Sequence, residues 1–252
     1  MKSKRGILIG IVTAVVTILC ILLLPASSVL NDKLLKHKRL NFSAITGYWW
    51  YGEVKALSVD YRGYRIDLGQ LHWRFDWQTL VSARWCVDGA NSASQELINT
   101  RFRLCYQVLE SRFQIIDSVV EIDAKTLANV SGLEIAGQWL VNISSATIVD
   151  NRLLDVSGKA VWARAQWHNG ESWFVLGDVL SIVDTNQAST INIDMIDIKS
   201  PLQIKLTMSF PPQQQWKMNG FIEPYDDLPV SLAESLMLMS SSVSGKRYYF
   251  DY

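Results

Sequence analysis

The sequence has little net charge, few cysteines and histidines, and few segments with helical spacing. Its 24 basic and 24 acidic side chains cancel, and neither sign forms a long run. Nucleic-acid-binding surfaces are usually basic patches, so this balance argues against a nucleic-acid partner. Apolar residues make up 49% of the chain, which is too many for a disordered protein. The composition therefore predicts a folded globular protein.

Motifs of the familiar catalytic classes are also missing. The chain has no G-x-S-x-G, no complete phosphate-binding loop and no H-E-x-x-H. The three histidines, His37, His72 and His168, lie far apart in the sequence. A metal site built from His72, Cys86 and Cys105 is conceivable, but these residues offer no closely spaced pair of ligands. We therefore predict a protein that is not an enzyme, with no catalytic residues, no metal site and no cofactor.

Only three cysteines are present, and one of them, Cys20, lies inside an apolar run. Cys86 and Cys105 both lie in segments that alternate as strands do. A disulfide between them would close a loop of roughly 20 residues and contribute about 3 kcal/mol. Such a bond suits an oxidising compartment, and a pair of inert thiols is the alternative. The favoured interpretation is the Cys86–Cys105 disulfide.

A long hydrophobic run lies at the N-terminus. Lys2, Lys4 and Arg5 precede an uncharged stretch over residues 7–24. As a helix this stretch would be about 27 Å long, close to the thickness of a bilayer's hydrocarbon core. The alternative is a cleaved signal peptide, because small residues follow at 25–28, but the run is long for a signal sequence. We therefore expect an uncleaved transmembrane anchor.

Competing features bear on the orientation of this anchor. Four basic residues within 33–39 follow the run, and the positive-inside rule alone would keep them in the cytoplasm. The short basic N-terminal tail and the cysteine pair favour the opposite orientation. The predicted organisation is a cytoplasmic tail over 1–6, an anchor over 7–24, a juxtamembrane segment over 25–41 and a periplasmic domain over 42–252. The expected location is the inner membrane of a Gram-negative bacterium, crossed once.

The stretch YRIDLGQLHWRFDW, residues 64–77, indicates what kind of structure follows the anchor. Apolar residues occupy even positions before Gly69 and odd positions from Leu71 to Phe75. Because side chains alternate between the two faces of a strand, a bulge led by a glycine of positive φ would preserve one apolar face. A second tight turn at Gly69 and Gln70 is the alternative. We favour the bulge within one long strand.

Similar alternation continues towards the C-terminus. Two-residue hairpin loops are expected at 62–63 and 169–170, because glycine suits the primed turns of hairpins. Helical spacing occurs over residues 228–239 and in a short candidate over 92–99. About a dozen closely spaced strands indicate an all-β fold, in which a curled or folded-over antiparallel β-meander follows the single N-terminal helix.

Aromatic residues dominate the predicted apolar face. Ten tryptophans are present, and most of them are expected to fill the core. Trp73, Phe75, Trp139 and Trp162 would line one side of the curled sheet, either in a solid core or in an apolar trough for a lipid or a partner. Alternating apolar faces are usually cores, so the core is favoured over the trough.

In addition to these patterns, a set of motif residues occurs in a fixed order along nearly the whole chain. Its members are Gly47, Trp50 and Gly52, then Leu68, Gly69, Leu71, Trp73, Phe75 and Leu80, and finally Gly220, Pro224, Pro229, Leu232, Leu236 and the ending GKRYYFDY at 245–252. Together with the basic tail and the anchor, this set resembles protein N of the bacterial type II secretion pathway. The adjacent Trp49 and Trp50 and the cysteine pair depart from the family pattern.

The resemblance implies a function and a set of partners. Members of this family are single-pass inner-membrane proteins with a periplasmic β domain, counted as accessory parts of the secretion machinery. They are also distantly similar to AsmA-type proteins, whose folded-over sheets enclose lipid tails. We therefore expect an accessory component that supports protein transport across the outer membrane through contacts with other inner-membrane components and with membrane lipid. The alternative is a lipid-binding or lipid-handling periplasmic module.

Overall fold

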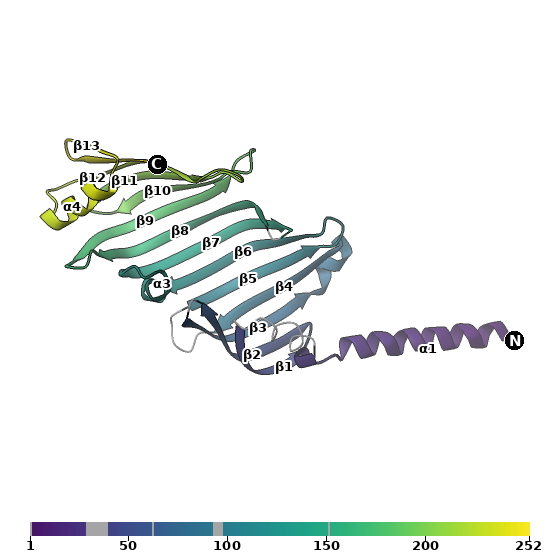
Figure 1. Cartoon of the computed structure of the whole chain (residues 1–252). Helices are drawn as coiled ribbons and strands as arrows, with labels where there is room; N and C mark the ends of the chain where they lie inside the picture. Colours follow the sequence, from purple (N-terminus) through teal and green to yellow (C-terminus); the bar gives the residue numbers. More distant parts are fainter. Residues whose placement is uncertain (1, 29–39, 62, 93–97, 151) are drawn as a thin grey trace.

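The computed structural model describes residues 2–28, 40–61, 63–92, 98–150 and 152–252. Within these ranges an N-terminal helix is followed by a long series of strands with three short helical segments between them (Figure 1). The elements are α1 (Lys2–Leu22), β1 (Leu40–Tyr48), β2 (Tyr51–Tyr61), β3 (Tyr64–Asp76), η1 (Trp77–Ser82), β4 (Arg84–Ser92), β5 (Ile98–Gln107), β6 (Arg112–Asp123), α3 (Ala124–Ser131), β7 (Ile135–Val149), β8 (Arg152–His168), β9 (Trp173–Thr185), β10 (Ile191–Lys199), β11 (Leu202–Phe210), β12 (Lys217–Pro224), α4 (Val230–Met239), β13 (Ser242–Ser244) and β14 (Arg247–Asp251).

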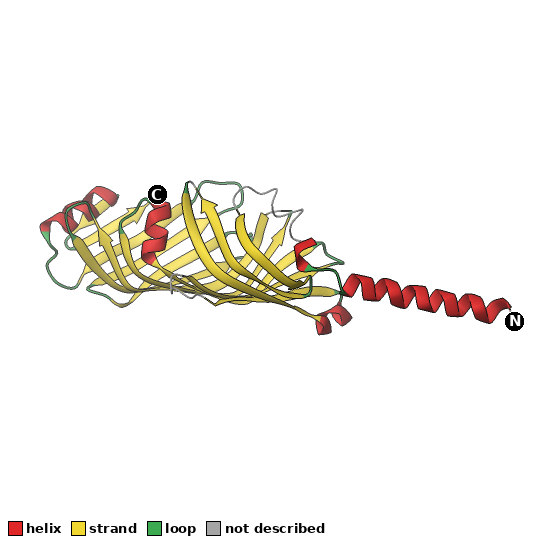
Figure 2. Ribbon diagram, turned by 90° about the horizontal axis from the view of Figure 1, so that it is seen from below, coloured by secondary structure: helices red, strands yellow, loops and turns green. Residues whose placement is uncertain are grey.

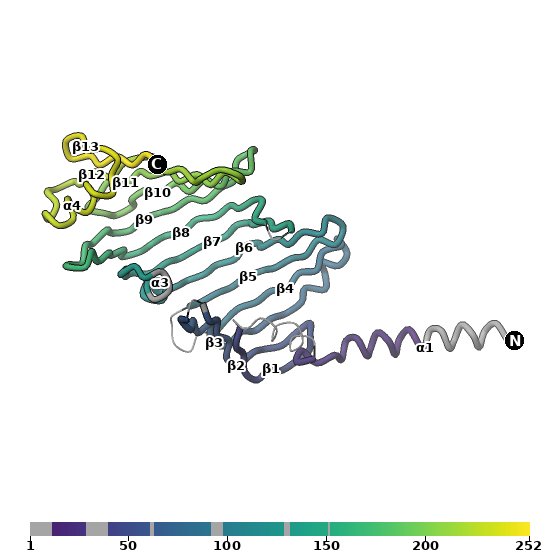
Figure 3. The backbone as a smooth tube through the Cα atoms, viewed as in Figure 1, coloured from purple at the N-terminus to yellow at the C-terminus, as the bar shows by residue number. Residues whose placement is uncertain are grey.

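The strands form one 14-stranded sheet whose spatial order follows the sequence, except that β14 lies between β12 and β13. Neighbouring strands are antiparallel, as a meander requires, and the chain crosses the sheet from one edge to the other (Figure 3). The sheet is curved but not closed, because β1 and β13 remain its two separate edges (Figure 2). The predicted all-β antiparallel fold is therefore confirmed, in the form of a single open sheet.

The helix α1 extends away from the end of the sheet that carries β1 (Figures 1 and 2). Among the residues that the structure describes, no helix combines the length and the apolar character needed to cross a membrane.

The bulge predicted at Gly69 is present. β3 runs unbroken from Tyr64 to Asp76, Gly69 has a φ of +70°, and the pairing with β2 shifts register at Leu57. The carboxylate of Asp67 supports the bend by accepting a hydrogen bond of 2.9 Å from the Gly69 N–H. The apolar residues on the two sides of the bulge therefore share one face.

Residues other than glycine make similar bulges further along the sheet. Asp117 in β6 has a φ of +45° and Arg164 in β8 has a φ of +51°. At Asp117 the extra residue places Ile115 and Ser118 on the same face, although strict alternation would separate them. Asp is among the non-glycine residues that tolerate a positive φ best. These irregularities keep the apolar residues of long strands on one side.

Most of the predicted turns and helices can be compared with the structure. Tyr61 pairs with Tyr64 across the first hairpin, as predicted. The second hairpin is present with Gly170 at a φ of +98°, but the predicted two-residue loop is wrong: His168 pairs with Trp173, so the loop covers the four residues 169–172. The helix predicted over 228–239 is α4. The candidate helix over 92–99 falls mainly on residues 93–97, outside the described residues, while Ile98 and Asn99 belong to β5. The helix α3 and the 3-10 helix η1 were not predicted.

The expectation that most tryptophans fill the core is wrong. None of the ten is among the buried residues, and Trp77, Trp85, Trp173 and Trp216 are exposed. The physical reason is the architecture: a single sheet with little helix to cover it cannot bury large rings from both sides. The four exposed tryptophans are therefore available for contacts outside the core, whereas Trp167 is half-buried against the C-terminal core cluster.

Candidate functional site

One face of the sheet is apolar from β3 to β9. Cross-strand partners point to the same side of an antiparallel sheet, so register traces this apolar face from strand to strand. One register row consists of Phe75, Val87, Leu104, Ile115, Ala146 and Val156. A second row consists of Ile98, Ile122, Trp139, Trp162 and Val179. We call this surface the apolar face.

All four residues predicted to line the trough lie on the apolar face, but in two separate places. Trp73 and Phe75 come from β3, and Phe75 is only 7% exposed. Trp139 and Trp162 pair across β7 and β8, where their rings stack with centroids 5.1 Å apart. Both of these indoles and Trp73 are only half-buried. The sheet thus brings the aromatic residues to one side without sealing them in a core.

Cover for the apolar face is concentrated at the C-terminal end of the sheet. The two clusters of buried hydrophobic residues found within the described ranges are Phe174, Leu232, Leu236 and Phe250, and then Val179, Leu202 and Ile204. Leu232 and Leu236 belong to α4, so this helix supplies the second layer there. On the middle strands, by contrast, Leu104 and Phe113 are exposed. Ile98 and Ala146 on the same face are buried, so the apolar face is open around Leu104 and Phe113 rather than along all of its middle strands.

A row of apolar side chains also crosses the opposite, mainly polar face. Leu140 follows Trp139 in β7 and therefore points to the other side of the sheet. Its register partners in turn are Val161, Leu180 and Ile196. Leu140 is 47% exposed and Ile196 is 39% exposed. We call these four residues the outer row.

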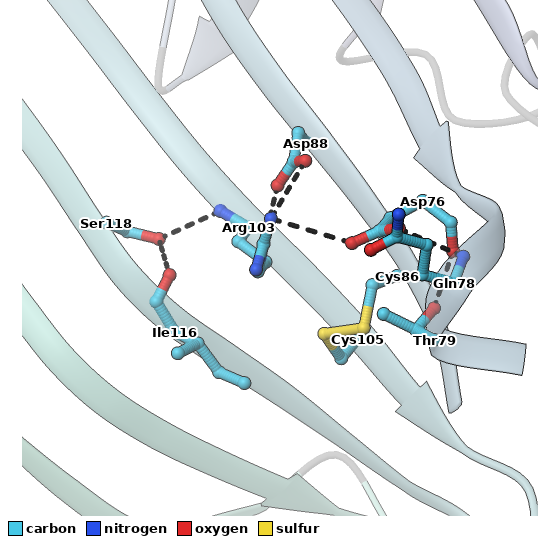
Figure 4. Close-up of polar contacts among 9 residues, drawn as sticks. All are labelled: Asp76, Gln78, Thr79, Cys86, Asp88, Arg103, Cys105, Ile116 and Ser118. Atoms are coloured by element: carbon cyan, nitrogen blue, oxygen red, sulfur yellow. Dashed lines mark hydrogen bonds and ion pairs between the residues drawn. A yellow bond between two sulfur atoms is a disulfide. The ribbon is translucent and has the colours of Figure 1, made fainter. Parts of the chain in front are cut away.

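The N-terminal part of the polar face is held together by charge and by a covalent bond (Figure 4). The Arg103 guanidinium donates hydrogen bonds to both carboxylate oxygens of Asp88, at 2.6 and 3.1 Å. The hydrogen bond to Asp88 raises the pKa of Arg103 above its ordinary value, because the carboxylate stabilises the charged guanidinium. The predicted disulfide between Cys86 and Cys105 is present and joins β4 to β5. This arrangement stabilises the sheet and has no catalytic geometry.

A hollow of about 490 Å³ lies beside this arrangement. Its lining includes Arg74, Arg101 and Arg103, together with the carboxylates of Asp88 and Asp117. Positive and negative side chains are therefore mixed in the hollow, so its charge favours neither anionic nor cationic ligands. No group of three or more metal-binding side chains occurs among the described residues.

The junction between α1 and the sheet is built by the adjacent tryptophans. The Trp49 indole N–H donates to the carbonyl of Ile21 at 2.8 Å, and the Trp50 indole N–H donates to the carbonyl of Leu22 at 2.9 Å. The last four carbonyls of a helix have no partner within the helix, and the two indoles donate to two of them. The adjacent pair that departs from the family pattern thus attaches α1 to the turn between β1 and β2.

The glycines near this junction allow close packing of rings on the backbone. A Cβ added to Gly52 would lie 2.5 Å from the Trp73 ring, so only glycine leaves room for that indole. The Trp73 indole N–H in turn donates to the Trp49 carbonyl at 3.2 Å. This close approach explains why glycine occupies position 52. The spacing of the motif alone did not show that the Trp73 ring packs against it.

These features define a class of protein: an open antiparallel sheet with apolar surface on both faces, suited to binding and lacking a recognisable catalytic centre among its described residues. Comparison with known protein families then assigns the chain to one family. The model of the family described as type II secretion system (T2SS), protein N, matches residues 38–250. The chain belongs to this family and is a component of the type II secretion system. No curated protein and no solved structure matches the chain.

Proposed function

We propose that the protein is an accessory inner-membrane component of the type II secretion system that acts by binding other components of the machinery rather than by catalysis. In this proposal residues 1–6 lie in the cytoplasm, residues 7–24 cross the membrane, residues 25–41 are the juxtamembrane segment, and residues 42–252 form the periplasmic domain. Family membership supports the secretion role. The uncharged run over 7–24 supports the anchor.

The outer row is the observation that carries the binding role. Leu140, Val161, Leu180 and Ile196 form a continuous apolar strip on a face that carries mainly polar side chains. Exposed contiguous apolar surface rimmed by polar groups marks interaction sites in soluble domains. Burying one large aliphatic side chain of this kind against a partner contributes about 1.5–3 kcal/mol. The strip is therefore suited to a neighbouring protein of the secretion complex.

The test replaces one residue of the outer row with a charged residue. Leu140→Glu should weaken co-purification of the other inner-membrane secretion components about tenfold and reduce export of secreted proteins, because it would bury an uncompensated carboxylate in the interface. Asn142→Glu is the matched control, since Asn142 is exposed on the same face of β7. Unchanged co-purification and export in Leu140→Glu would contradict the proposal.

A second candidate function is favoured by the apolar face. Leu104 and Phe113 are exposed and Trp139 and Trp162 are half-buried on the middle strands, and this apolar surface is suited to a lipid-handling module. Native mass spectrometry of the full chain extracted in a mild detergent would then detect phospholipid in a fixed ratio to protein. Protein that retains its fold and carries no phospholipid would count against this candidate.

A further inference from the structure

A cavity lies where α1 meets the sheet. It has a volume of about 290 Å³ and is lined by Ile18, Ile21 and Leu22 on the helix side, and on the sheet side by Trp49, Phe75, Trp77, Leu80 and Trp85. Ligand pockets in proteins usually measure roughly 300–1,000 Å³, so this cavity is at the small end of that range. We call it the junction cavity.

The junction cavity offers an apolar surface with rigid walls. The rings of Trp49, Phe75 and Trp77 pack against one another, with centroids between 4.9 and 5.8 Å apart. The lining has no charged side chain, and the Trp49 indole N–H is engaged by the carbonyl of Ile21. A polar or charged ligand would lose its hydration without gaining partners here. The chemistry of the lining selects a slender hydrocarbon chain.

The junction cavity is continuous with the apolar face. Phe75 lines the cavity and begins the register row that continues through Val87 and Leu104. Trp85 also lines it, and the ring of its register partner Tyr106 packs against Phe113 in a tilted arrangement, with ring centroids 4.8 Å apart. A chain that enters from the side of α1 therefore meets apolar surface onward across β4, β5 and β6.

We propose that the junction cavity binds one acyl chain of a bilayer phospholipid. The proposal rests on the proposed membrane anchor, because an inserted α1 brings the cavity to the boundary between hydrocarbon and water. Ile18 and Ile21 on the helix side and Trp77 and Trp85 on the sheet side then face the lipid together, because all four line the same cavity. Tryptophan is enriched at this depth of a membrane, where its ring is apolar and its N–H finds a polar partner.

The experiment uses the full chain in vesicles of phosphatidylethanolamine and phosphatidylglycerol that contain a phospholipid with a photoreactive diazirine in one acyl chain. After illumination, mass spectrometry locates the labelled residues. We expect label on Trp77 and Trp85, in addition to Leu19, which is exposed on α1, does not line the cavity and reports ordinary contact with the bilayer. Flotation of the vesicles on a density gradient separately reports whether the chain inserts.

Two neighbouring positions in η1 provide the variant and its control. Leu80 lines the junction cavity and is 40% exposed, whereas Val81 does not line it and is 95% exposed. Leu80→Asp should lower labelling of Trp77 and Trp85 about tenfold, because a carboxylate would enter the apolar cavity. Val81→Asp should leave the labelling unchanged. Leu80→Trp, which fills the cavity without adding a charge, should lower labelling in the same way and serves if Leu80→Asp unfolds.

The outcomes distinguish a failure of the acyl-chain site from a failure of the membrane anchor. Vesicles that float with the protein but label only Leu19, or equal labelling of Trp77 and Trp85 in every variant, would overturn the acyl-chain site and leave the anchor standing. Wild-type protein that fails to float would overturn the anchor and the site together.

Discussion

Gly177→Ala should destabilise the sheet by about 3 kcal/mol or more. Gly177 in β9 has a φ of +80°, and a Cβ added there would lie 2.1 Å from the backbone carbonyl oxygen of Lys199. The left-handed conformation alone costs an L-residue about 1–2 kcal/mol. Displacing the packed backbone of β10 adds about 1–3 kcal/mol. For a domain of this size the loss corresponds to a fall in Tm of about 6–12 °C, measurable by circular dichroism.

Gly63→Ala is the matched control for this prediction. Gly63 has a φ of +86°, close to that of Gly177, but a Cβ added to it would meet no atom within 4 Å. It should therefore show only the backbone cost of about 1–2 kcal/mol. Equal shifts in Tm for the two variants would mean that the close approach of β9 to β10 carries no energetic weight.

Loss of the disulfide should have the second large effect. Cys86 and Cys105 are 2% and 1% exposed, and the bond between them closes a loop with a sequence separation of 19. Restricting such a loop in the unfolded chain contributes about 3 kcal/mol. The double variant Cys86→Ala, Cys105→Ala should lower the free energy of unfolding by that amount, and so lower the midpoint of urea unfolding. A reducing agent should have the same effect on the wild-type protein.

Cys20→Ala controls for the removal of cysteine itself, because Cys20 is exposed and forms no disulfide. Its unfolding midpoint should equal that of the wild-type chain. If the double variant also unfolded at the wild-type midpoint, the bond between β4 and β5 would contribute nothing to the stability of the sheet.

The strands were predictable because period-two alternation is a local property of the sequence. Gly69 could be assigned to a bulge, because glycine accepts a positive φ without strain. Asp117 and Arg164 carry no such signal, and they occupy positive φ only because their neighbours fix the register on both sides. Such residues become recognisable once pairing is known. The openness of the sheet was not predictable either, since closure depends on how far the curvature accumulates over all its strands.

The candidate binding surfaces were predictable only in part. Alternation placed Trp73 and Trp139 on one face, but it could not show that Trp139 stacks on Trp162 while Trp73 lies some strands away. The outer row arises entirely from register, because Leu140 and Ile196 are remote in sequence and meet through Val161 and Leu180. The junction cavity depends on where α1 lies against the sheet, which no local pattern encodes.

The sequential order of the strands has a consequence for how the chain acquires its structure. From β1 to β12 each strand pairs with its immediate successor, so no strand waits for a distant segment before it can form hydrogen bonds. Short-range contacts of this kind cost little loop-closure entropy and favour fast folding. Growth can then be vectorial: each newly released hairpin adds to the strands already formed, much as units accumulate in repeat proteins. A chain that becomes available for folding from one end can therefore add its strands one after another, before the rest of the domain is present.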